Sequence, residues 1–187
     1  VTDVAIDDGV ASFTHQAVAD TLEKIDDERG VDGGANVNAV AITIIDAVSI
    51  NDASTLRGLL EDNHGNTSFT YNLVEDTAGV LAHANGITDS GDDDIHGKTV
   101  TISGATSLAQ LATIRTRVGD NSLVTHTAVT DTYDALEARA ASAIDDINGK
   151  TVIASTGGTL EELATLKTQV ENVIGDDGIV TDVAIDD

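Results

Sequence analysis

The sequence predicts an α/β protein in which strand–helix units with parallel strands repeat along the chain as a solenoid. Three observations lead to this prediction. Residues 1–8 recur unchanged as residues 180–187, at an offset of 179 residues. Inside that period, a weaker pattern occurs three times. Each copy joins a strand-like alternation to a helix-like apolar stripe, and units of this kind bury by stacking the apolar faces that none can bury alone.

The exact repeat defines the expected domain organisation. We interpret residues 1–187 as one period of 179 residues plus the first eight residues of the next, because chance identity over eight positions is negligible. The sub-repeats run roughly over residues 38–97, 98–149 and 150–187, the last continuing into residues 1–37 of the next period. Since the first residue is Val rather than Met, we expect a processed product or an excised piece.

The first half of each sub-repeat is expected to be a strand followed by a helix. Alternation of Thr with Val or Ile predicts strands at residues 42–44 and 98–102, and residues 152–154 hold the corresponding place in the third copy. A capping-box pattern then precedes two of the three apolar stripes, at Ser107 with Gln110 and at Thr159 with Glu162. The stripes, which predict helices, are Ile50, Ala53, Leu56 and Leu60; Leu108, Leu111, Ile114 and Val118; and Leu160, Leu163, Leu166 and Val170.

The second half repeats the strand–helix order. Strands are expected at residues 69–74, at 124–129, and at 180–185 or equally 1–6. Helices are expected to open at Asp76 and Asp131, which are favourable N-cap residues, and to cover residues 13–25. Gly97 and Gly149 belong to one shared motif and predict turns with positive φ. Because helices join consecutive strands, the strands should be parallel.

A compact doubly wound α/β domain is the alternative fold. Both faces of its sheet are covered, so its strands are usually continuous apolar runs, whereas the strands predicted here alternate. No Gly-rich nucleotide-binding fingerprint follows a predicted strand. The solenoid is therefore the favoured prediction.

Composition excludes several classes of partner. The chain has 33 acidic residues against 9 Lys and Arg, a formal net charge of -24, and no Cys. Such a surface repels the phosphates of nucleic acid and anionic lipid headgroups. Absence of Cys excludes disulfides and thiolate metal sites. No apolar run is long enough for a membrane span, so we expect neither nucleic-acid binding nor membrane insertion.

Aspartate clusters in predicted loops raise the question of calcium. Calcium prefers several carboxylate and carbonyl oxygens, and the best candidate ligands are Asp89, Asp92, Asp93 and Asp94. The alternative is that these and other clusters, such as Asp145 and Asp146, are solvated turns carrying surface charge. Calcium is therefore a possible cofactor, and no other cofactor is expected.

No pattern of residues predicts an active site. Gly-Lys-Thr at residues 97–99 and 149–151 resembles the end of a phosphate loop, but the earlier glycine is missing and a strand follows. The five His are scattered, and no strand pair carries the paired carboxylates of a polysaccharide-acting enzyme. Outward-facing Thr is compatible with an ice-binding solenoid, although its spacing varies between strands. We therefore expect a non-enzymatic protein.

Residues 100–114 and 129–132 carry a family resemblance. They are similar to the Thr/Ala/Asp-rich repeats of very large bacterial cell-surface proteins, including surface-layer and adhesin-like proteins that are often secreted with repeats-in-toxin modules. The resemblance covers nearly the whole chain. It implies an extracellular, structural protein, and calcium binding as in many members of that group.

Together these observations predict a structural repeat of an extracellular fibre, surface layer or large adhesin. Its partners would be copies of itself that stack end to end. The apolar residues expected to carry the stacking are Leu108, Leu111, Ile114, Leu160, Leu163 and Leu166. A calcium-dependent binding or adhesion module is the alternative; an ice-binding solenoid or a polysaccharide-acting enzyme is less favoured.

Overall fold

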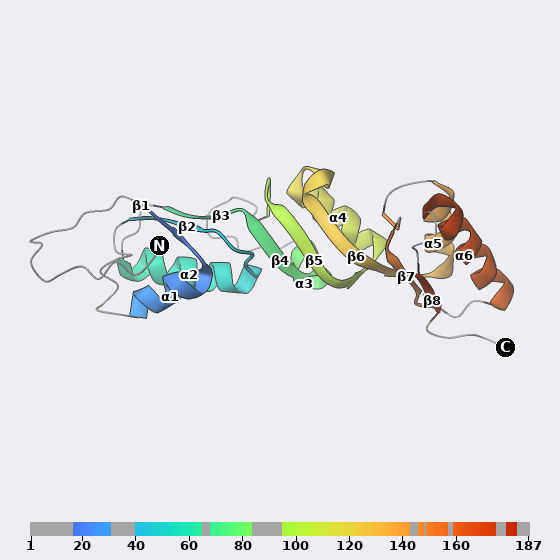
Figure 1. The fold of residues 1–187 in the computed structure, drawn as a ribbon, viewed down its shortest axis with the longest axis horizontal. Helices are drawn as coiled ribbons and strands as arrows, with labels where there is room; N and C mark the ends of the chain where they lie inside the picture. The colour runs from blue at the N-terminus through green and yellow to red at the C-terminus, as the bar shows by residue number, and fades with distance from the viewer. Residues whose placement is uncertain are drawn as a thin grey trace, which may run out of the picture. The chain divides into compact units, whose positions relative to one another are not determined.

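The computed structural model describes residues 17–30, 40–64, 68–83, 95–142, 146–147, 149–156, 159–174 and 179–182. In these residues the chain is a mixed α/β protein with two parallel sheets and six α-helices (Figure 1). It divides into two compact units, Val1–Val74 and Glu75–Asp187, and each unit is described by itself.

The first unit contains a three-stranded parallel sheet in the order β1-β2-β3. Figure 1 shows both of its helices along one side of the strands. The elements are β1 (Ala17–Asp20), α1 (Leu22–Gly30), β2 (Ala41–Ile44), α2 (Ile50–His64) and β3 (Ser68–Tyr71).

Alternation along the strands gives this sheet one buried face. Ile42 and Ile44 of β2 are buried, and the register places Ile44 beside the buried Tyr71 of β3. On the other face, Thr43 and Thr70 are in register and their Oγ1 atoms lie 3.0 Å apart. The period-2 pattern of the sequence is therefore a division between an apolar face and a polar face.

The second unit carries a five-stranded sheet whose order, β4-β5-β6-β7-β8, also follows the chain. The described pairings from β5 to β8 are parallel. The elements of this sheet and its helices are β4 (Leu73–Thr77), α3 (Ala78–Ala82), β5 (Thr99–Thr106), α4 (Leu108–Val118), a 3-10 turn (Asn121–Leu123), β6 (Val124–Asp131), α5 (Tyr133–Ala141), β7 (Thr151–Ala154), α6 (Leu160–Ile174) and β8 (Ile179–Asp182).

Residues from neighbouring strand–helix units share the core of the second unit. The register aligns Thr106, Val129, Val152 and Val180 in one row across β5 to β8. Helices α4, α5 and α6 each add apolar residues to the same cluster, so no single strand–helix unit closes its own core. The cluster consists of Leu108, Val129, Tyr133, Leu136, Ala140, Ile147, Val152, Ala154 and Leu166.

Several local predictions are confirmed. Gly97 and Gly149 have φ of 69° and 64°, and both end the turns that lead into β5 and β7. Ser107 and Gln110 form both arms of a capping box, each N–H donating to the other side chain at 3.1 Å. The stripes on α2 and α4 are buried, from Ile50 to Leu60 and from Leu108 to Val118.

Three predictions about the second halves of the sub-repeats are wrong. The expected helix over residues 13–25 is replaced, in its described part, by β1 and the start of α1. Asp76 and Asp131 are not N-caps: Thr77 and Thr132 are, because each Asp is still extended at the end of a strand and accepts a hydrogen bond from the next N–H. The expected strand at residues 69–74 is divided between β3 and β4 at Asn72.

The stripe of α6 is only partly buried, in contrast to the prediction. Leu166 is fully buried, but Leu163 is half-buried and Leu160 is 63 % exposed. The structure thus confirms the mixed α/β class with parallel strands. It does not show a solenoid, and a compact α/β domain fits it too.

Candidate functional site

The four candidate calcium ligands, Asp89, Asp92, Asp93 and Asp94, lie outside the described residues. Within the described ranges, no group of three or more His, Asp or Glu side chains is arranged to hold a metal ion. The polar groups that the structure does bring together lie elsewhere, in the second unit.

A buried ion cluster forms around Asp146, which follows α5. Asp146 is only 3 % exposed. The prediction that Asp146 belongs to a solvated acidic turn is therefore wrong. Nη1 of Arg115 on α4 donates to its Oδ1, and Nη1 of Arg139 on α5 lies 3.3 Å from its Oδ2. One carboxylate therefore bridges two guanidinium groups. Removing it would leave both arginines without this partner in a site that water screens poorly.

His126 is the buried imidazole beside this cluster. It occupies an inward position of β6, in register with Ile102 of β5, and is 3 % exposed. Its Nε2 donates to the carbonyl oxygen of Asp146 at 2.7 Å. Burial lowers the pKa of His126, and the positive charges of Lys150 and Arg115 lower it further, while the bond to Asp146 opposes them. The ring is consequently neutral at pH 7.

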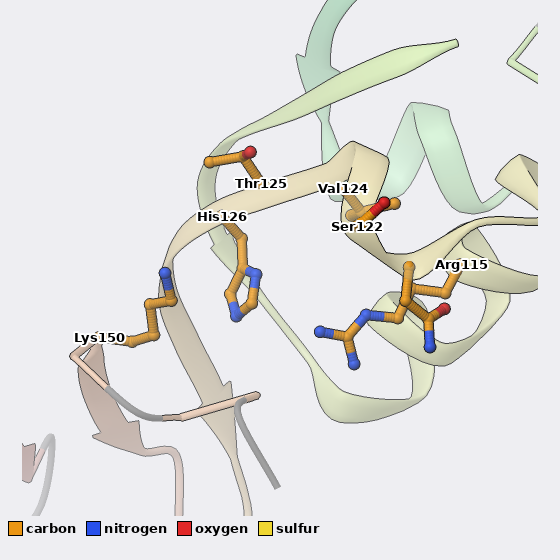
Figure 2. Close-up of a pocket in the computed structure, with 7 residues that line it drawn as sticks. Arg115, Ser122, Val124, Thr125, His126 and Lys150 are labelled. Atoms are coloured by element: carbon orange, nitrogen blue, oxygen red, sulfur yellow. The ribbon is translucent and has the colours of Figure 1, made fainter. Parts of the chain in front are cut away.

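His126 opens onto a pocket of about 390 Å³. Figure 2 shows its ring between the side chain of Lys150 and the guanidinium of Arg115. Lys150 reaches this place because the turn at Gly149 leads directly into β7, next to β6. The lining residues are Arg115, Asn121, Ser122, Val124, Thr125, His126 and Lys150.

The contacts in the pocket favour binding over nucleophilic chemistry. The hydroxyl of Ser122 donates to Oδ1 of Asp120 at 2.7 Å, and Nε2 of His126 is directed to Asp146. Among the described side chains, Ser122 and His126 therefore form no hydroxyl–imidazole pair of the kind that activates a nucleophile. What the pocket offers is hydrogen-bond donors and positive charge.

A second recurring polar feature caps the helices. In three described cases, the first N–H of a helix donates to a side chain at or just beyond the end of the strand that follows that helix. These contacts satisfy a helix N–H that has no partner within the helix, and they tie each unit to the next. The pairs are Leu22 with Asp46 Oδ1 (2.9 Å), Leu108 with Asp131 Oδ2 (3.0 Å), and Tyr133 with Thr156 Oγ1 (3.3 Å).

Neither the buried ion cluster with its pocket nor the helix caps were predicted from the sequence. The strand alternation held a signal for His126, because it occupies the same phase as the buried Val124. No local pattern identifies the partners, since Asp146 lies 20 residues from His126 and 31 from Arg115. Of the three cap acceptors, Asp131 alone lies in the recurring Val-x-Asp-Thr of residues 18–21, 74–77 and 129–132, so the sequence carried little signal for these caps.

No protein-family model matches the chain, and no curated protein or solved structure is significantly similar to it. In the described residues, no helix combines the length and apolar character needed to cross a bilayer. The fold and the contacts above therefore define the molecule only as an α/β protein with parallel sheets and a polar pocket in its second unit.

Proposed function

We propose that this chain is a non-enzymatic structural repeat of an extracellular fibre, surface layer or large adhesin, and that its strand–helix units stack end to end as a solenoid. The extracellular setting is supported by the Asp-rich, Cys-free composition and by the resemblance of residues 100–114 to bacterial cell-surface repeats. The stacking is supported by four structural features.

The order of the strands in the two sheets is the first feature that supports stacking. In both sheets the order follows the chain, whereas doubly wound domains reverse their order at a switch point. The strands also keep one polar face, as at Thr43 and Thr70, where a doubly wound sheet would be covered by helices on both sides.

The helix caps are the second feature. Each cap is supplied by the next strand–helix unit along the chain. The first N–H of these helices is therefore satisfied by the following strand–helix unit and not by the unit that contains the helix. Interactions restricted to successive neighbours are the energetic basis of solenoids.

Exposure of Leu160 is the third feature. Leu160 and Leu108 hold the same position in successive sub-repeats, but Leu108 is 8 % exposed and Leu160 is 63 % exposed. Leu108 belongs to the same cluster as Tyr133 and Leu136 of the following helix. Leu160 belongs to the last unit, and an additional unit would cover it in the same way.

The edge strand β8 is the observation that carries the proposal. Residues 180–182 of β8 open the octapeptide that repeats residues 1–8, and among the described strands β8 is the last of its sheet. An edge strand has unpaired backbone groups that can pair with another strand. The point where the period restarts is thus a point where a sheet can continue.

Electron microscopy and sedimentation velocity of the full chain test this proposal. We expect concentration-dependent fibres, layers or linear oligomers, and their loss on deletion of residues 180–187, which removes most of β8. Deletion of residues 183–187 is the control, because it leaves β8 intact. Monodisperse single chains at every concentration, or equal assembly by both deletion variants, would contradict the proposal. Circular dichroism checks that each variant is folded.

A further inference from the structure

We propose that the pocket beside His126 is a binding site for a small oxyanion, such as a phosphate, sulfate or carboxylate group. Arg115, His126 and Lys150 are basic, and none of the other lining residues is acidic. This is unusual in a chain with 9 Lys and Arg and a net charge of -24. The inference is independent of the proposed structural function, which requires no ligand.

Arg115 provides the first donor. Its Nη1 is used by Asp146, but its Nε is buried and has no hydrogen-bond partner in the described residues. Figure 2 shows the guanidinium directed toward His126 across the pocket. The guanidinium therefore brings a positive charge to the pocket wall, and an oxyanion there would lie between this charge and that of Lys150.

Lys150 provides the second positive charge. It is half-buried and follows the turn at Gly149. It lies close enough to His126 to disfavour protonation of the ring, and Arg115 acts in the same direction. Within the described residues no carboxylate forms an ion pair with Lys150.

Among the described residues, the carboxylates of Asp146 and Asp120 lie next to lining residues, and both are already engaged. Asp146 is held by Arg115 and Arg139, and it accepts nothing from Lys150. Asp120 accepts from the hydroxyl and then from the N–H of Ser122, and these two bonds, the hydroxyl bond most of all, lower the pKa of Asp120. Neither carboxylate lines the pocket, so neither opposes an anion directly.

His126 is expected to couple the binding of an anion to protonation of its own ring. Because its Nε2–H is bound to the Asp146 carbonyl, a second proton must be carried by Nδ1. Lys150 and Arg115 disfavour that proton, and an anion between them would offset both. We therefore expect sulfate to bind more tightly at about pH 6 than at about pH 8, with uptake of a proton.

Isothermal titration calorimetry of the full chain at constant ionic strength tests the site with sulfate, inorganic phosphate and acetate. We expect Lys150→Gln to weaken sulfate binding by about fivefold or more, and Lys150→Arg to retain it. Lys98→Gln is the matched control, because Lys98 holds the same place in the Gly-Lys-Thr turn of the preceding sub-repeat and does not line the pocket.

The three probes separate the sources of the ligand. Binding of sulfate and phosphate indicates a sulfated or phosphorylated ligand, and binding of acetate alone indicates a carboxylate; either supports the site if it depends on Lys150. Equal weakening by Lys98→Gln and Lys150→Gln means only general charge attraction and overturns the inference. Absence of binding by all three anions also overturns it.

Discussion

His126 is the residue whose ionisation the fold opposes through burial and two neighbouring cations. In the unfolded chain it titrates near 6.5, whereas in the fold its pKa is lower. As the pH falls through and below 6.5, the unfolded state therefore takes up a proton before the folded state does. The contribution of His126 to the free energy of unfolding is therefore complete above pH 6.5, and it is lost as the pH falls through the lower pKa of the folded state.

Urea unfolding from about pH 8 to about pH 5 measures this loss. Relative to His126→Gln, which can still donate to the Asp146 carbonyl, the wild-type chain should become less stable as the pH falls. His83→Gln serves as the control, because His83 is exposed, and it should follow the wild type. Protonation of carboxylates affects all three proteins alike. Parallel profiles for wild type and His126→Gln would show that His126 does not contribute.

At the scale of single elements, burial separates leucines that the sequence makes equivalent. Leu111 is fully buried on α4, and Leu160 is 63 % exposed on α6. We expect Leu111→Ala to lower the free energy of unfolding by about 2–5 kcal/mol. Leu160→Ala in the single chain should cost no more than about 0.5 kcal/mol. Equal costs in thermal or urea unfolding would mean that the stripes are misassigned.

Local patterns predicted most elements correctly because they depend on neighbouring residues in the chain. The capping box at Ser107 and the positive φ of Gly97 are contacts and conformations within one turn. The start of α5 was displaced by one residue because Asp131 stays in the strand and caps α4 instead. That role depends on which helix lies beside the strand end, which is tertiary information.

The site was beyond prediction for the same reason. His126, Asp146 and Arg115 come from β6, from the chain after α5 and from α4. Their ionic and hydrogen-bonding roles arise only when these segments pack together. Strand alternation could place His126 inward, but it could not tell that a carbonyl and two cations would meet it there.

At the scale of the whole molecule, charge is the dominant feature. A net charge of -24 on 187 residues means that like charges repel across the surface of the molecule, and they would also repel between the stacked copies that we propose. Salt should reduce this repulsion, since surface charges are screened within about 10 Å at about 0.1 M.

We therefore expect high NaCl, and millimolar CaCl₂, to raise the melting temperature measured by circular dichroism. NaCl at the ionic strength of the CaCl₂ sample is the control. A larger increase with calcium than with this control would support the calcium-dependent alternative at Asp89, Asp92, Asp93 and Asp94. An unchanged melting temperature in both salts would mean that charge repulsion does not limit the stability of the protein.

Two joined periods test the central claim, namely that units complete one another along the chain. Residues 1–179 are followed directly by residues 1–187, and Leu160→Ala is placed in the first period or in the second. If stacking covers Leu160, the substitution in the first period should cost about 2 kcal/mol or more by urea unfolding, against no more than about 0.5 kcal/mol in the second. The same small cost in both periods, with two copies that unfold independently, would contradict the account.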